Sequence, residues 1–228
     1  MPSAQEIQTD DVGPAATRTD LRSLLHAIHS SNYSKLSLLH PRGKVLFAEG
    51  ESARGVFILR TGRATVSISS SEGRLVILQI AQPGAVLGLN SALRNAPYNT
   101  TIKLIEPGRT DFIPRKQLVE LLQSDQLAAH AVSQILSREV AELTDRARSL
   151  LLPQTANARL ARLLLEWSEH APQIPKTFTQ EEIAQMICSS RETVTRLIAA
   201  LNRRRIICMT TDSIVISDRT ALQKLATG

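Results

Sequence analysis

The chain has 228 residues, of which 43% are hydrophobic, and 27 Lys and Arg against 21 Asp and Glu give a net charge of +6. This composition excludes a largely disordered protein, and the modest positive charge permits nucleic-acid binding without proving it. No apolar stretch approaches the roughly 18 residues that a membrane helix needs. The first 20 residues lack a secretion signal, so we expect a cytoplasmic protein with no membrane contact.

The N-terminal half predicts a β-rich domain. We expect a loose tail over residues 1–20 and a short helix over Leu21–Ser30. From Lys44 to Phe112 the apolar runs are short and separated by glycines, which is typical of a small antiparallel barrel or jelly roll. The predicted strands are Val45–Phe47, Val56–Leu59, Ala64–Ile68, Leu75–Ile80 and Val86–Leu87, with a hairpin turn at Ser69–Gly73.

A long helical region follows. From Arg115 to Leu152 there is neither Gly nor Pro, which indicates one long helix or two helices with a break near Ser124. Apolar residues in steps of three and four resemble a coiled-coil seam, so we expect a homodimer, with packing of this stripe on the chain's own barrel as the alternative. The expected dimer interface is Val132, Leu136, Val140, Leu143 and Ala147.

The C-terminal part begins after Pro153. A helix is predicted over Ala156–His170 and a loop over Ala171–Lys176, and then come two helices joined by a turn and two strands, Ile206–Thr210 and Ser213–Ser217. We therefore expect a tail (1–20), a β-barrel domain (21–114), a long helix (115–152) and a C-terminal domain (153–228), an α+β organisation.

The most informative stretch is the predicted helix-turn-helix. Thr179 with Glu182 forms a capping box that starts the first helix, and Ser189 and Ser190 supply a turn and a second N-cap. The second helix has an apolar stripe for burial at Val194, Leu197, Ile198 and Leu201.

The opposite face of that second helix suits the DNA major groove. Glu192, Arg196, Ala199 and Arg203 fall on this face at about 100° per residue, and Arg191 reaches out from the first turn. Arg can bind guanine through two hydrogen bonds and Glu can accept from cytosine, while Ser190 and Thr193 can contact phosphate. Residues 191–205 hold five arginines and one acid. The alternative interpretation is a solvated charged helix.

An enzyme is the alternative from another class, because small jelly rolls also house metal-dependent oxygenases. Those sites need two or three His with a carboxylate, and no His lies between Lys44 and Phe112. We expect no catalytic residues, no metal site and no cofactor.

The string Cys188-Ser-Ser-Arg-Glu-Thr-Val-Thr-Arg196 closely resembles the recognition-helix motif of the cyclic-AMP receptor protein/fumarate-nitrate regulator (CRP/FNR) superfamily of bacterial transcription factors. The resemblance covers about residues 21–217. It implies a jelly-roll β-barrel like a cyclic-nucleotide-binding domain, a long dimerisation helix and a winged helix-turn-helix, with Ile206–Ser217 as the wing.

By this resemblance, a homodimer would bind double-stranded DNA at a TGTGA-like palindrome and work with RNA polymerase. Arg191, Glu192 and Arg196 would read bases. The residues expected at phosphates are Thr179, Gln180, Ser190, Thr193 and Arg203.

The sequence departs from the family where cyclic AMP would bind. Leu89 stands where members that bind cyclic AMP carry a Glu for the ribose, and Asn99 stands where they carry an Arg for the phosphate. Losing these contacts should cost several kcal/mol, so we expect no activation by cyclic AMP and leave the effector unknown. The degenerate pocket comprises Gly88, Leu89, Asn99, Thr100 and Thr144; a cyclic-nucleotide sensor with an atypical pocket is the alternative.

Two further features bear on this family reading. Cys188 replaces the glycine usual in the turn, where a left-handed backbone costs a non-glycine residue about 1 kcal/mol. We expect it to be a small, semi-buried side chain, with a redox role beside DNA as the alternative. The family's oxygen sensors hold a cluster on N-terminal cysteines, which this chain lacks, and His26, His29 and His40 are weak candidates for haem.

Overall fold

The computed structural model describes residues 36–152, 155–170 and 173–227, so the predicted tail and the predicted Leu21–Ser30 helix lie outside the described residues. Two compact units divide the chain: residues 1–68 with 80–140, and residues 69–79 with 141–228. The helix α4 (Gln126–Leu151) contributes residues to both units. None of the described helices is long and apolar enough to cross a membrane.

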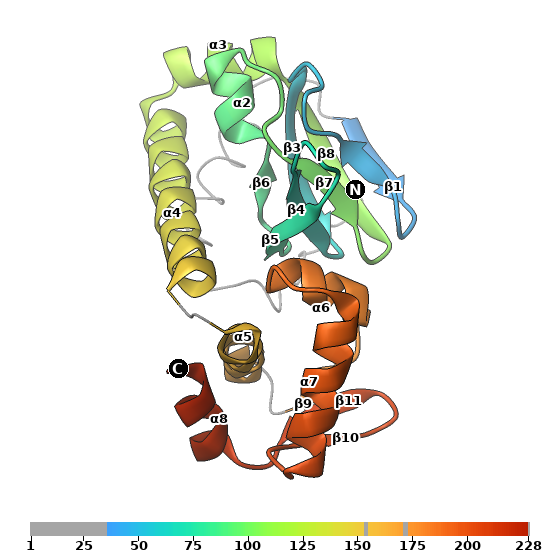
Figure 1. Cartoon of the computed structure of the whole chain (residues 1–228). Coiled ribbons are helices and arrows are strands. Elements are labelled where there is room, and N and C mark those ends of the chain that lie inside the picture. The colour runs from blue at the N-terminus through green and yellow to red at the C-terminus, as the bar shows by residue number, and fades with distance from the viewer. Residues whose placement is uncertain (1–35, 153–154, 171–172, 228) are drawn as a thin grey trace, which may run out of the picture. The chain divides into compact units, whose positions relative to one another are not determined.

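Two four-stranded sheets form the β-rich part (Figure 1). One has the order β1-β8-β3-β6, and the other has the order β2-β7-β4-β5. The strands are β1 (Leu36–His40), β2 (Val45–Phe47), β3 (Gly55–Thr61), β4 (Ala64–Ser69), β5 (Leu75–Ala81), β6 (Val86–Leu87), β7 (Thr101–Leu104) and β8 (Gly108–Pro114). The sheets do not close into a barrel, but the jelly-roll description holds.

All five predicted strands are present, and the hairpin turn between β4 and β5 is also confirmed. The backbone N–H of Gly73 donates to the carbonyl of Ser70 at 2.9 Å. The sequence analysis missed β1, β7 and β8, and it missed α2 (Leu89–Arg94).

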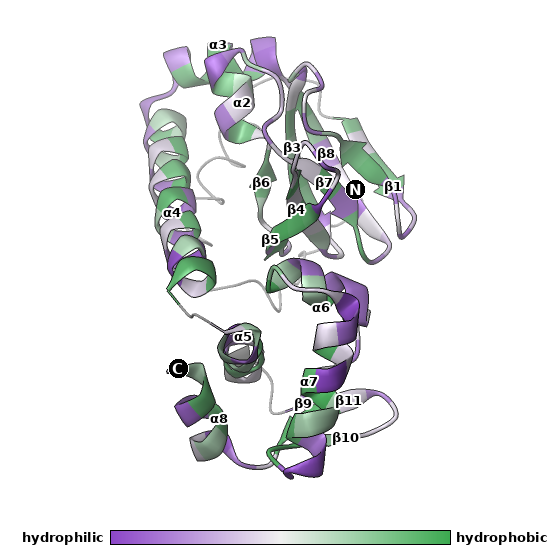
Figure 2. Ribbon diagram, in the orientation of Figure 1, coloured by the Kyte–Doolittle hydropathy of each residue, from purple (hydrophilic) through white to green (hydrophobic). Residues whose placement is uncertain are grey.

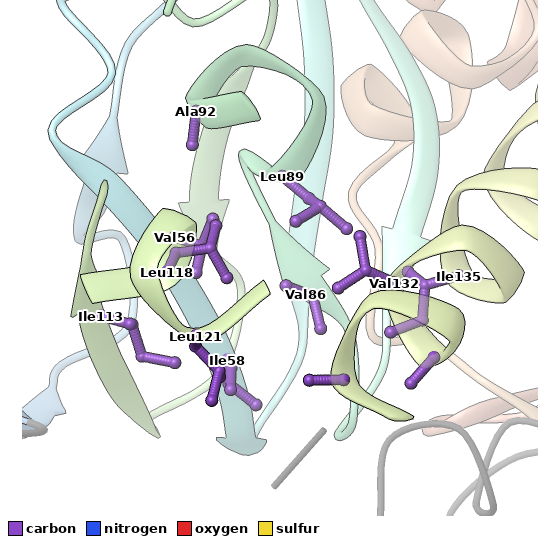
Figure 3. Close-up of a cluster of buried hydrophobic side chains, with 12 residues drawn as sticks. Val56, Ile58, Val86, Leu89, Ala92, Ile113, Leu118, Leu121, Val132 and Ile135 are labelled. Carbon is purple, nitrogen blue, oxygen red and sulfur yellow. The ribbon is translucent and has the colours of Figure 1, made fainter. Parts of the chain in front are cut away.

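The predicted long helical region is two helices, α3 (Arg115–Ser124) and α4, with the break at Asp125. Asp125 starts α4, because its Oδ1 accepts from the backbone N–H of Leu127 at 2.8 Å and of Ala128 at 3.1 Å. The first part of α4 packs against α2, α3, β3, β6 and β8 (Figure 3). This core cluster comprises Val56, Ile58, Val86, Leu89, Ala92, Ile113, Leu118, Leu121, Ala128, Ala131, Val132 and Ile135.

The second unit holds the C-terminal elements. They are α5 (Ala156–His170), β9 (Gln173–Pro175), α6 (Gln180–Met186), α7 (Arg191–Arg203), β10 (Ile207–Met209), β11 (Ser213–Ile216) and α8 (Arg219–Ala226). The strands form an antiparallel sheet with the order β10-β11-β9. Leu160, Leu164, Ile187 and Leu201 are almost fully buried and form the centre of this packing. The helix-turn-helix and both C-terminal strands were predicted, whereas β9 and α8 were not.

Candidate nucleic-acid interface

The capping box at the start of α6 is formed as predicted. The Thr179 hydroxyl accepts from the backbone N–H of Glu182 at 3.1 Å, and the Glu182 carboxylate accepts from the backbone N–H of Thr179 at 2.8 Å. The Thr179 hydroxyl also donates to that carboxylate at 3.0 Å. Both hydrogen-bonding functions of this hydroxyl are therefore used inside the protein, and a phosphate contact from Thr179 would have to displace Glu182.

The turn between α6 and α7 has the left-handed backbone expected of it. Cys188 has φ of 49°, and the N–H of Ser189 donates to the carbonyl of Ala184 at 2.9 Å. Arg159 from α5 holds this turn from outside, because its Nε donates to the carbonyl of Ile187 at 2.7 Å and its Nη2 to that of Cys188 at 3.4 Å.

Ser190 is the N-cap of α7, and its hydroxyl accepts from the backbone N–H of Thr193 at 3.2 Å. Val194, Ile198 and Leu201 are buried beneath the helix, while Leu197 is only half-buried. The apolar stripe therefore fixes α7 against its own unit and determines which face turns outward.

The outward face of α7 carries the predicted base-reading residues. Arg191, Glu192 and Arg196 are all exposed, as are Ala199 and Arg203. Hydrophilic residues predominate at both ends of α7 in Figure 2. None of the three predicted reading side chains is folded into the core of the chain, so each is free to meet a surface brought to this face.

Glu192 is held as a carboxylate. Its pKa is lowered from 4.5, chiefly by a hydrogen bond from its own backbone N–H and then by one from the Ser190 hydroxyl. An ionised carboxylate only accepts hydrogen bonds, so at neutral pH this side chain can pair with an amino group but not with an acceptor. This is the chemistry that binding to the amino group of cytosine needs.

The structure adds Thr195 to this surface, a residue that the sequence analysis left out. The single hydrogen of its exposed hydroxyl is shared between two acceptors, Oε1 of Gln180 and the carbonyl of Arg191, the latter at 2.9 Å. Gln180 accepts through Oε1, so its amide nitrogen is the end left to donate outward. The helical spacing of Thr195 from Arg191 and Ala199 was a signal that could have found it.

The strands β10 and β11 form a hairpin in the predicted wing, with Ile207 opposite Ile216 and Met209 opposite Ile214. From the last residue of α7 toward this hairpin, Arg203, Arg204 and Arg205 are consecutive and exposed. These three arginines place positive charge between the end of α7 and the base of the hairpin.

Comparisons with known proteins agree with this geometry. A family model described as a Crp-like helix-turn-helix domain matches residues 158–225, and one described as a cyclic nucleotide-binding domain matches residues 39–125. The chain belongs to the CRP/FNR superfamily of transcription regulators. It is a transcription regulator with a helix-turn-helix DNA-binding domain, and its family is not one of enzymes.

Individual relatives span nearly the same length. The CRP-like cAMP-activated global transcriptional regulator of Mycobacterium tuberculosis is 26% identical over 82% of this chain and 86% of its own. The transcriptional regulator LdrP of Thermus thermophilus is 28% identical over 81% of this chain and 94% of its own. The crystal structure of a CRP-family regulator from Thermus thermophilus has a TM-score of 0.71 at 25% identity, covering 84% of this chain and 97% of that one.

We call the unit that matches the cyclic nucleotide-binding domain the sensor unit. It has core packing at Leu89, where the sequence analysis considered a nucleotide pocket. Leu89 is 1% exposed and belongs to the core cluster with Val86, Val132 and Ile135 (Figure 3). Before it, Gly88 has φ of 80°, and a Cβ there would lie 2.6 Å from Cε1 of Tyr98. Tyr98 stacks on Phe47 with ring centroids 3.7 Å apart and donates to the carbonyl of Gly55 at 2.7 Å.

The other predicted pocket residues differ in their exposure. Asn99 is exposed, and its Oδ1 accepts from the Ser91 hydroxyl at 3.3 Å. Thr100 is half-buried, and Thr144 is exposed on the part of α4 that belongs to the second unit. A surface pocket of the sensor unit has a different lining, which comprises Leu39, His40, Pro41, Thr61, Pro107 and Gly108.

The five apolar residues of α4 predicted to form the dimer interface, which we call the stripe, differ in burial between the first and second half of the helix. Val132 is 4% exposed inside its own sensor core, and Leu136 packs partly against that core, so Val132 was wrongly assigned to the dimer interface. For Val132 and Leu136, the alternative prediction, packing of the stripe on the chain's own β-rich domain, is confirmed. Farther along α4, Val140 is 64% exposed and Leu143 is 46% exposed, and Ala147 is exposed as well.

Cys188 is exposed, as is Cys208, so the expectation of a semi-buried side chain at Cys188 was wrong. The Cys188 carbonyl faces Arg159, and the side chain is left at the surface. Among the described residues no group of three His, Cys, Asp or Glu could hold a metal ion. His40 donates to or accepts from the hydroxyl of Thr110 at 2.8 Å, while His26 and His29 lie outside the described residues.

Proposed function

We propose that this regulator acts as a homodimer on a TGTGA-like palindrome and does so without activation by cyclic AMP. The exposed polar face of α7 is the observation that carries the proposal. Arg191 and Arg196 offer planar donor pairs that match guanine O6 and N7, and Glu192 offers the acceptor that matches cytosine N4. All three side chains belong to the N-terminal half of the same helix, and the N-terminal residues of this helix contact base edges in this class of motif.

The five residues proposed to contact phosphate differ in whether their donor groups are already used in hydrogen bonds within the protein. Arg203 and the amide nitrogen of Gln180 are available donors. Ser190 and Thr193 share a hydrogen bond of 3.0 Å between their hydroxyls, and Thr179 is engaged with Glu182. We therefore expect Arg203 and Gln180 to bind phosphate more strongly than the three hydroxyl residues.

The homodimer is supported by the second half of the α4 stripe. Val140, Leu143 and Ala147 are exposed at helical spacing on a helix whose first half is already anchored in the sensor core. Burying two such apolar stripes against each other would remove them from water, at about 25 cal/mol for each Å² of apolar area. A palindromic site requires the same twofold symmetry.

Independence from cyclic AMP is supported by the packing around Leu89. In members that bind cyclic AMP, a carboxylate accepts from the ribose hydroxyl and a guanidinium pairs with the cyclic phosphate. Leu89 has no acceptor, and Asn99 carries no positive charge. The proposal includes RNA polymerase as a partner and the cytoplasm as the location, both of which follow from a role in bacterial transcription rather than from a described contact.

The decisive experiment is footprinting of the purified chain on a duplex with a TGTGA palindrome, with and without cyclic nucleotides. We expect protection of both half-sites without nucleotide and no tightening when cyclic AMP is added. Protection that appears only with cyclic AMP would contradict the ligand-independent proposal. Equal binding to a scrambled duplex would contradict the base-reading proposal.

The dimer is tested separately with Leu143→Glu, with the exposed polar Glu142→Gln as the matched control. We expect Leu143→Glu to sediment as a monomer and to lose protection of the palindrome, because it places two carboxylates at the seam. A Leu143→Glu protein that remains dimeric would place the interface elsewhere.

A further inference from the structure

Arg146 differs in burial from its immediate neighbours on α4. Its neighbours Asp145, Ala147 and Arg148 are exposed, whereas Arg146 is half-buried. Its Nη2 donates to the carbonyl of Met186, the last residue of α6, and to the carbonyl of Ile77 in β5 at 3.2 Å. Arg146, Ile77 and Met186 all lie in the second unit.

The carbonyl of Met186 is at the C-terminal end of α6, where helix carbonyls lack intrahelical partners and carry partial negative charge. Arg159 holds the next two carbonyls, those of Ile187 and Cys188. Two guanidinium groups from two helices therefore hold three consecutive carbonyls of the turn that leads into α7. Arg159 comes from α5 inside the DNA-binding domain, and Arg146 comes from the dimerisation helix.

Holding the Arg146 guanidinium in this half-buried position costs free energy of hydration. Burial lowers the pKa of its guanidinium, against the opposing effect of the Glu166 carboxylate, and its Nε is buried with no hydrogen-bond partner among the described residues. A cation that is partly desolvated loses free energy of hydration unless its new contacts compensate for it. A side chain on the surface of a helix could avoid this cost by extending into water, so the contacts with Met186 and Ile77 compensate for it.

The position of Arg146 relative to the proposed seam matters for the dimer. Leu143 and Ala147 lie on the stripe, and at about 100° per residue Arg146 lies ~100° from Ala147 and ~60° from Leu143 around α4, at the margin of the stripe. A partner helix centred on the stripe would therefore lie beside Arg146, whose guanidinium is already directed to α6. One helix can then hold the partner subunit on one side and the turn before α7 on another.

We propose that Arg146 is a positioning residue that fixes α7 relative to the dimerisation helix and so sets the spacing between the two reading helices. This inference rests on the proposed homodimer and its palindromic site. It is independent of the base contacts themselves, because Arg146 acts through the backbone of the turn and not through DNA.

The experiment compares the full-length chain with Arg146→Gln on palindromic duplexes whose half-site spacing is native or changed by one or two base pairs. Arg148→Gln is the matched control, because Arg148 is exposed two residues away on the same helix and pairs locally with Asp145 at 3.3 Å. Affinity for a duplex without the site and the melting temperature are measured in parallel.

We expect Arg146→Gln to lose at least about tenfold of the preference for native spacing, as losing hydrogen bonds from a charged group implies. Affinity for non-specific DNA and the melting temperature should stay close to wild type, and Arg148→Gln should behave as wild type throughout. Hydrogen exchange at residues 187–191 should become faster in Arg146→Gln. Arg146→Lys should recover part of the preference, since its ammonium can still donate to a carbonyl.

The inference is overturned if Arg146→Gln keeps the spacing preference of the wild type. It is also overturned if that variant loses affinity equally on all duplexes with a lower melting temperature, because a general structural role would produce this result. If the wild type itself shows no preference for the palindrome, the proposed function fails, and this outcome is distinct from both others.

Discussion

The sensor unit and the DNA-binding unit have opposite surfaces at the positions where this family meets its ligands. In the DNA-binding unit, Arg191, Glu192 and Arg196 are exposed around a helix whose apolar side is buried. In the sensor unit, Leu89, which the family resemblance would place at the ribose, is packed into the core. The difference teaches that the polar residues predicted to bind DNA are left at the surface, whereas the position predicted to face the ribose is filled by core packing.

The largest expected effect tests the sensor side. Leu89→Glu should destabilise the protein by at least about 3 kcal/mol, because it puts a carboxylate among Val86, Val132 and Ile135. Thermal unfolding with and without cyclic AMP measures it, and Asn90→Glu at the exposed neighbouring position is the control. A stable Leu89→Glu protein whose melting temperature rises further with cyclic AMP would contradict the account, because it would show that a nucleotide pocket is present beside residue 89.

The next effect tests the DNA side. Arg196→Ala should weaken binding to the palindrome by roughly 1–3 kcal/mol and relax the preference at one base pair. Arg204→Ala should instead flatten the salt dependence of binding and leave the sequence preference unchanged. Competition titrations with single-base variants measure both. Uniform weakening by Arg196→Ala on every sequence would mean that this arginine binds phosphate.

A smaller effect sharpens the role of local sequence in the DNA-binding unit. Ser190→Ala removes the acceptor for the N–H of Thr193 and should cost about 1 kcal/mol of stability. Chemical denaturation followed by the fluorescence of Trp167, which stacks on Phe178 in this unit, measures it. Thr220→Ala, at an exposed position of α8, should change little. Equal stability of the two variants would contradict the capping role.

The smallest effect concerns pH. The pKa of Glu192 is lowered from 4.5, so the carboxylate stays ionised as pH falls from 7 to 5.5. Its contribution to site preference should therefore be constant over this range and should be lost only as pH falls through the lowered value. The readout is the ratio of wild-type to Glu192→Gln affinity at each pH. A ratio that collapses above pH 5 would contradict it.

Local signals made the helix-turn-helix predictable. Thr179, Ser190 and the buried stripe of α7 each act within a few residues, and together they define both helices and the turn. The same holds for the sensor strands, where glycines mark the turns. The left-handed backbone at Cys188 was implied by the family resemblance, in which a glycine is usual at this position, and it is present.

What the sequence could not provide depends on distant partners. The strand β9 contains Pro175 and exists through pairing with β11, and β1 exists through pairing with β8. The helix α2 has six residues and no side-chain cap, so it carries no local start signal. Likewise, the spacing of Val132 fits both a dimer seam and a core, and only packing against Leu89 and its neighbours decides between them. By contrast, α8 could have been found from its cap, Asp218.

Methylation interference at guanine N7 tests the base-reading face of α7 most directly. In a TGTGA-like palindrome, a methyl group on N7 blocks a paired hydrogen bond from an arginine without changing the phosphates. We predict that methylated guanines in both half-sites exclude the wild-type protein and that Arg196→Ala loses sensitivity at one of them. Wild-type binding that tolerates methylation at every guanine would contradict the assignment of Arg191 and Arg196 to the bases.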